Sequence, residues 1–183
     1  MNELDRLMEG NKRYIEGNLA EKDVKAARLE TQDGQKPFVT VVTCSDSRVV
    51  PEYIFDENIG QIFVIRTAGN IVDTITLGSI EYGVEHLHTP LLVVLGHEKC
   101  GAVTAACAGG ECGHNIAAIV EKLKPSVEKG EKNVEKAVNE NIYAVISEIR
   151  EKSEVVKKLE QEGKLKIIPM KYYFSDGRVE KVE

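Results

Sequence analysis

The sequence has no long apolar run and no excess of basic residues. No hydrophobic stretch approaches the ~20 residues that a helix needs to cross a bilayer. The first residues also lack the basic segment and apolar core of a signal peptide. The net charge of -6, with no Lys/Arg-rich segment, argues against binding to nucleic acid or to an acidic membrane surface. We therefore expect a cytoplasmic protein that binds neither nucleic acid nor membranes.

Motifs typical of redox and nucleotide-binding proteins are missing as well. The 4 cysteines form no Cys-x-x-Cys pair, which argues against a thiol redox protein. The glycines form no dinucleotide-binding fingerprint. Because the chain carries no export signal, we expect reduced thiols, some of them bound to metal, in preference to two disulfides.

The length and the apolar pattern indicate one domain with several buried strands. A chain of 183 residues is long enough for one domain with a proper core, and no repeat or low-complexity linker divides it. Apolar runs without polar alternation are typical of strands that are buried on both faces. The expected strands are 38–44, 61–66, 91–95 and 164–170. A fifth, at 171–174 or 178–182, would pair as an antiparallel hairpin at the edge.

Helical spacing of apolar residues fills the intervals between these strands. Helices are expected at 3–16, 20–31, 51–55 and 74–88 and, as one or two surface helices, within 131–162; the helical pattern after residue 102 is broken at 109–110, Pro125 and Gly130. This alternation favours an α/β fold: a central, mostly parallel four-stranded sheet with an antiparallel fifth edge strand, flanked by helices. Residues 1–183 then form a single domain, with an N-terminal helical arm (1–33), a sheet core (34–107 and 164–182) and a helical region (114–163).

Two of the predicted strands end at residues that bind metals. Cys44 ends the first strand, and His97 and Cys100 follow the third in a His-x-x-Cys pattern. Neighbouring parallel strands lie ~4.8 Å apart, so both strand ends can reach one ion. Two thiolates and an imidazole suit Zn²⁺ and leave its fourth position open for water, as in catalytic zinc sites. We therefore predict one zinc per chain, bound by Cys44, His97 and Cys100.

Asp46 and Arg48 closely follow the first of these ligands. They can form a local ion pair that ties down the loop, and the same pair can serve catalysis. Arg48 would hold the Asp46 carboxylate ionised and oriented, so that it accepts a hydrogen bond from zinc-bound water. If the carboxylate rotates, it can instead take the fourth metal position. The sequence leaves these two mutually exclusive states open.

A second group of candidate ligands is formed by Cys107, Cys112 and His114, in and after a Gly-rich segment. The group lacks a fourth partner, which disfavours a second metal site. We interpret Cys107 as a core residue of a helix and Cys112 as an exposed thiol.

Two motifs taken together resemble the β-class carbonic anhydrases. They are Cys-Ser-Asp-Ser-Arg at 44–48 and Gly-His-Glu-Lys-Cys-Gly at 96–101, and the segments 10–14, 66–70 and 78–82 are similar to the family too. The resemblance implies a zinc enzyme that reversibly hydrates carbon dioxide to bicarbonate and a proton. Zinc-bound hydroxide would attack carbon dioxide, and the Asp46–Arg48 dyad would control the fourth zinc position.

The resemblance also assigns residues to the substrate. Gln35 matches a glutamine that hydrogen-bonds bicarbonate in the family. Phe63, Ala68 and Tyr82 match residues of the pocket that holds carbon dioxide. Gly101 matches a residue among the backbone donors near the metal. His86 matches a candidate proton shuttle, although a histidine on a helix is more often structural.

The family forms dimers in which the N-terminal helices reach over the partner, so the resemblance implies a homodimer or a higher homo-oligomer. The helix at 3–16 agrees, because its apolar side has no obvious partner within the chain. One branch of the family carries a Trp in a second, inhibitory bicarbonate site. This chain has no Trp, and Val41 stands at the matching position. We therefore expect water or hydroxide as the fourth zinc ligand at neutral pH.

Two alternatives remain open at this point. One is a hydrolase of carbon disulfide or carbonyl sulfide on the same scaffold, which the metal ligands cannot distinguish from a carbonic anhydrase. The other is a non-catalytic zinc-binding member of the family. The presence of both Asp46 and Arg48 argues against the second alternative.

Overall fold

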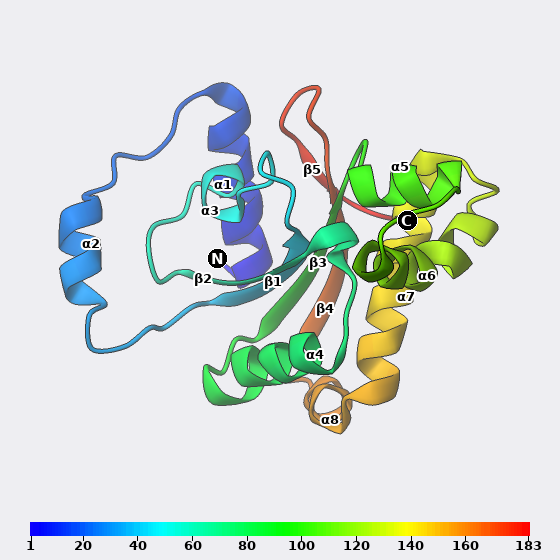
Figure 1. Ribbon diagram of the computed structural model, residues 1–183. Coiled ribbons are helices and arrows are strands. Elements are labelled where there is room, and N and C mark those ends of the chain that lie inside the picture. The colour runs from blue at the N-terminus through cyan, green and yellow to red at the C-terminus, as the bar shows by residue number, and fades with distance from the viewer.

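A five-stranded sheet forms the centre of the molecule in the computed structural model, which describes residues 1–183 (Figure 1). The strands are β1 (Val39–Cys44), β2 (Ile62–Thr67), β3 (Leu91–His97), β4 (Lys166–Tyr172) and β5 (Val179–Lys181). Their order is β2-β1-β3-β4-β5, and all neighbours are parallel except β4 and β5, which are antiparallel. The predicted α/β architecture, including the antiparallel fifth strand at the edge, is confirmed.

Helices cover both faces of this sheet. They are α1 (Glu3–Glu16), α2 (Val24–Glu30), α3 (Pro51–Ile54), α4 (Thr74–Glu81), α5 (Gly101–Ala108), α6 (His114–Lys129), α7 (Val134–Lys152) and α8 (Glu154–Gln161), with a 3₁₀ turn at Ala68–Asn70 and a π-helical turn at Tyr82–His86. Figure 1 shows α1 and α3 on one side of the sheet and α4 to α8 on the other, while α2 stands apart on two extended connections. None of the helices combines the length and the apolar character that crossing a lipid bilayer requires.

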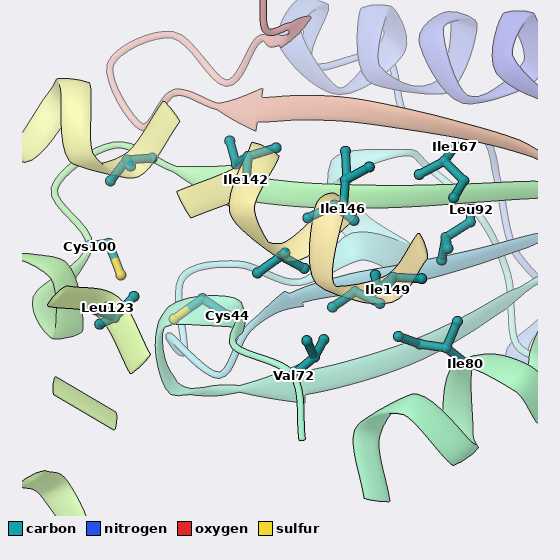
Figure 2. Packing of buried hydrophobic residues seen from close by; sticks show 14 of the residues in the cluster. Cys44, Val72, Ile80, Leu92, Cys100, Leu123, Ile142, Ile146, Ile149 and Ile167 are labelled. Carbon is teal, nitrogen blue, oxygen red and sulfur yellow. The ribbon is translucent and has the colours of Figure 1, made fainter. Parts of the chain in front are cut away.

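The side chains on the two faces of the sheet belong to two separate hydrophobic clusters, one on each face. Successive side chains of a strand point to opposite faces, so Val41 belongs to the cluster under α1 and α3, whereas Val42 and Cys44 belong to the cluster under the other helices. Figure 2 shows part of this second and larger cluster, in which α7 packs its apolar side against the strands. Every residue of β1 is buried, which agrees with the predicted central strand.

Helix α1 has a partner in its own chain, contrary to the expectation from the sequence. Leu7 is fully buried in the cluster that also contains Val41. The Asn11 amide also donates hydrogen bonds to the carbonyl oxygens of Ile54 (3.1 Å) and Gly177 (2.9 Å). The ends of the helix are set locally, by a capping box at Asn2 and by Gly17 in the left-handed conformation.

Three details of the sequence interpretation are wrong. Strand β2 is only half-buried, because it lies at an edge and pairs with β1 alone. The helix predicted at 74–88 ends as an α-helix at Glu81 and continues as a π-helical turn. Pro125 lies inside α6, where burial of neighbouring apolar residues offsets the lost hydrogen bond. The surface helices expected within 131–162 are confirmed, since α7 buries seven residues on one side and carries charged residues on its outer side.

Candidate metal centre

Three side chains that bind metals meet at the carboxyl ends of β1 and β3. Cys44 is the last residue of β1, His97 is the last residue of β3, and Cys100 immediately precedes α5. Their ligand atoms all lie within 4.8 Å of one another. The side chains are almost completely buried, with exposed fractions of 4%, 0% and 1%. In Figure 2 the two thiols lie at one end of the large cluster.

The ring of His97 is oriented for a metal by its own backbone. Its Nδ1 atom lies 2.9 Å from the carbonyl oxygen of Glu98, so Nδ1 carries the proton and donates it to that oxygen. The other nitrogen, Nε2, is buried and has no hydrogen-bond partner. An unpartnered buried nitrogen is costly, and its free lone pair is what a metal ligand needs.

The thiols of Cys44 and Cys100 share one hydrogen bond, which favours a thiolate at Cys44. Without an ion, a hydrogen bond from the Cys100 thiol lowers the pKa of Cys44 to about 4, although burial alone would raise it. The same hydrogen bond, together with burial, raises the pKa of Cys100. The backbone N–H of Gly69 also donates to Sγ of Cys44 over 3.3 Å. Since one thiolate is already favoured, a cation that displaces the remaining proton fits this donor set, and Zn²⁺ prefers this combination of sulfur and nitrogen.

Asp46 and Arg48 form a bidentate ion pair beside the three proposed ligands. Nε and one terminal nitrogen of Arg48 donate to the two carboxylate oxygens over 2.9 and 2.7 Å, and the Arg48 backbone N–H donates over 3.0 Å. These bonds hold the pKa of Asp46 well below its usual range. The carboxylate is not part of the group of converging metal ligands.

Two residues that the sequence interpretation gave no role support this loop. Arg66, on β2, donates hydrogen bonds to the carbonyl oxygens of Cys44 (3.1 Å) and Asp46 (2.6 Å). Phe174, after β4, lies under the guanidinium of Arg48. The role of Arg66 could have been predicted, because an arginine at the end of the strand beside β1 can reach the loop that follows Cys44. Nothing in the sequence near Phe174 indicates that its ring lies against Arg48.

Among the residues predicted to bind substrate, two lie next to the metal ligands. Ala68 begins the 3₁₀ turn that contains Gly69, and Gly101 begins α5 directly after Cys100. Gln35 is exposed in the connection between α2 and β1.

Phe63, Tyr82 and His86 form a separate group in the same chain. The rings of Phe63 and Tyr82 are 5.9 Å apart, and His86 stacks on Tyr82 at 5.3 Å. Thr67 is the register partner of Cys44 on β2, and Phe63 precedes it by four residues, which at ~3.3 Å per residue is a separation of about 13 Å along the strand. One chain therefore does not bring these rings to its own metal ligands.

Of the remaining thiols, Cys112 is exposed as expected, whereas Cys107 lies at the margin of the core and not within it. Cys107 is partly buried and packs against the large cluster, and Cys112 is exposed. His114 is exposed at the start of α6.

The family model described as carbonic anhydrase matches residues 39–179. This chain belongs to the β-carbonic anhydrase family. Carbonic anhydrase 2 of Mycobacterium tuberculosis is 38% identical over 181 residues, which cover 94% of this chain and 87% of that protein. The carbonic anhydrase of Mycolicibacterium smegmatis is 35% identical, and the match covers 95% of this chain and 89% of that protein.

A solved structure of the β-carbonic anhydrase family shares the fold of this chain. It comes from a study of two tetrameric β-carbonic anhydrases of the ascomycete Sordaria macrospora, and it superposes with a TM-score of 0.77 at 26% identity. The match covers 82% of this chain and 83% of the other. The family that the two sequence motifs predicted is thereby confirmed.

Proposed function

We propose that this chain catalyses the reversible hydration of carbon dioxide to bicarbonate and a proton, with one Zn²⁺ per chain held by Cys44, His97 and Cys100. The observation that carries the proposal is the buried convergence of these three ligands, with Nε2 of His97 left without a partner. A bound zinc lowers the pKa of its water to about 7 and so supplies a hydroxide nucleophile at neutral pH.

Asp46 orients the nucleophile in this proposal. Its carboxylate accepts three hydrogen bonds from Arg48, two at Oδ1 and one at Oδ2, and a carboxylate can accept about four. It therefore remains able to accept the proton of an attacking water or hydroxide and to aim the oxygen lone pair at carbon dioxide. Because Asp46 is bound to Arg48, and because Val41 stands where one branch of the family carries a Trp, we expect water or hydroxide, and not Asp46, at the fourth metal position at neutral pH.

The substrate pocket is proposed to need two chains. Ala68 and Gly101 lie beside the ligands of their own chain, but Phe63 and Tyr82 do not, and the Tyr82 ring is exposed to solvent. We therefore propose a homodimer or higher homo-oligomer in which copies of Phe63 and Tyr82 from a second chain form the apolar wall for carbon dioxide. His86, stacked on Tyr82, would then lie at the same surface and could carry the proton to solvent. The exposed Gln35 would hydrogen-bond bicarbonate.

Stopped-flow hydration of carbon dioxide, measured on protein of known zinc content, tests this proposal. We expect one zinc per chain and a hydration rate that rises with pH. Cys100→Ser should lose zinc and hydration together, whereas Cys112→Ser, which changes an exposed thiol, should keep both. Full zinc occupancy without hydration would overturn the proposal, and turnover of carbon disulfide or carbonyl sulfide in its place would support the hydrolase alternative.

A further inference from the structure

The ring of Phe174 packs against both Arg48 and the proposed metal ligand His97. The guanidinium carbon of Arg48 is 4.0 Å from the centre of the Phe174 ring. The imidazole of His97 lies 5.3 Å from the same ring, tilted by 57°. One aromatic side chain therefore contacts both a proposed metal ligand and the arginine of the proposed dyad.

The position of this ring is set by the end of β3. The Ser175 backbone N–H donates a 2.9 Å hydrogen bond to the Glu98 carboxylate, and the Glu98 N–H donates a 3.0 Å bond to the Tyr172 carbonyl oxygen. Tyr172 also packs edge-on against Phe174 at 5.3 Å. Since the carbonyl oxygen of Glu98 accepts the His97 Nδ1 proton, the same residue holds both the imidazole and the loop that carries the ring.

Arg48 needs such a support because its side chain is 53% exposed. Exposed ion pairs contribute little on their own, and long side chains in water change rotamer freely. Asp46 binds the edge of the guanidinium through its N–H groups, while Phe174 covers a face. The two contacts do not compete, and together they leave the guanidinium one orientation. Asp46 is then held on Arg48 and away from the metal position.

We propose that Phe174 is a positioning residue: it keeps Asp46 hydrogen-bonded to Arg48 and thereby leaves the fourth metal position open. This inference rests on the proposed zinc site. The alternative state is one in which Asp46 leaves Arg48 and occupies the fourth metal position. Loss of the ring frees Arg48 and shifts the equilibrium toward that state.

Binding of azide to the Co²⁺-substituted protein, measured by visible absorption, reports the open fraction, which is the fraction of molecules whose fourth metal position is not occupied by Asp46. Azide needs the fourth metal position, so Asp46 competes with it. With Phe174→Leu we expect the Kd for azide to rise measurably, by at most about five-fold. An exposed cation–π contact changes the equilibrium between the two states by roughly two- to five-fold, and the Kd rises in proportion as the open fraction falls. The kcat for hydration should fall by a similar factor, and Phe174→Tyr, which keeps the ring, should restore both.

Tyr173→Leu is the matched control. Tyr173 is the neighbouring residue, and its ring lies under Arg178 at 3.8 Å, so the substitution removes the same kind of contact without touching Arg48. We expect it to leave the Kd for azide unchanged. The proposal is overturned if Phe174→Leu leaves the Kd unchanged, or if Tyr173→Leu changes it equally. If the unsubstituted protein binds azide but does not hydrate carbon dioxide, the proposed function fails while the Kd comparison still decides the role of Phe174.

Discussion

The side-chain amide of Asn141 donates a 2.9 Å hydrogen bond to the carbonyl oxygen of Gly69. Asn141 lies on α7, and Gly69 lies in the 3₁₀ turn after β2, with both residues buried. The N–H of Gly69 in turn donates to Sγ of Cys44. Helix α7 therefore supports a proposed metal ligand through a single residue, Gly69, although it contributes no ligand itself.

Replacing Asn141 by Ala should weaken both the fold and the metal site. The buried carbonyl oxygen of Gly69 would lose its partner, which costs roughly 1–3 kcal/mol of unfolding free energy, and loss of an outer support typically lowers metal affinity about 10-fold or more. Urea unfolding and zinc competition with a chromophoric chelator measure the two effects. Asn139→Ala is the control on the same helix, because the Asn139 side-chain oxygen has no partner. Equal losses in both variants would refute the supporting role of Asn141.

Gly69 itself should not tolerate a side chain. Its φ of +70° is unfavourable for other residues, and an added Cβ would lie 3.2 Å from both the Ala102 Cβ and a Leu123 methyl carbon. We expect Gly69→Ala to lower the unfolding free energy by about 1–2 kcal/mol and to weaken zinc binding. Gly113→Ala, at an exposed position with open space around it, should change neither. A Gly69→Ala protein with unchanged zinc affinity would show that zinc binding does not depend on the left-handed backbone of Gly69.

Asp46→Asn should retain zinc and lose most of the hydration activity. The amide cannot accept both hydrogen bonds from Arg48 or offer the same acceptor to the nucleophile, and removal of such a group typically costs roughly 10²-fold or more in rate. Stopped-flow hydration on metal-quantified protein measures the loss. Asp176→Asn is a close match, because Asp176 pairs with Arg178 at the same spacing but outside the metal centre. Similar activity in both variants would remove Asp46 from the mechanism.

A second carboxylate, Asp56, should make stability depend on pH. Burial alone would raise the pKa of Asp56, but hydrogen bonds from Lys22, Arg13 and the Ala20 N–H outweigh it and lower the pKa to about 2. Because the folded-state pKa lies below the unfolded value of ~3.9, the stabilisation is complete above about pH 5 and is lost as the pH falls toward 2.

The Asp56→Asn variant isolates this contribution. At pH 7 we expect it to unfold more easily than the parent protein by on the order of 2 kcal/mol, and we expect the difference to shrink between pH 4 and pH 2. Urea unfolding of both proteins across this range is the measurement. A difference that stays constant with pH would show that the Asp56 charge is not what stabilises the fold.

Local patterns in the sequence were enough to predict the strands of the sheet and the proposed metal ligands. The β-branched runs predicted β1 and β3, because a strand buried on both faces leaves no room for polar alternation. Once these strands are placed side by side in parallel, Cys44, His97 and Cys100 must lie near one another. The spacing of Asp46 and Arg48 likewise made their pairing a short-range feature that the sequence contains.

Contacts between distant parts of the chain were decided only by the tertiary structure. The in-chain partner of α1, the bond from Asn141 to Gly69 and the ring of Phe174 under Arg48 each join segments whose approach depends on strand register and helix packing. The separation of Phe63 and Tyr82 from Cys44 is of the same kind, since it follows from the β1–β2 register. The residues that can hold the metal were predictable from the sequence, because strand and helix periodicity is local. The surroundings of those ligands come from packing between remote segments, which no local pattern encodes.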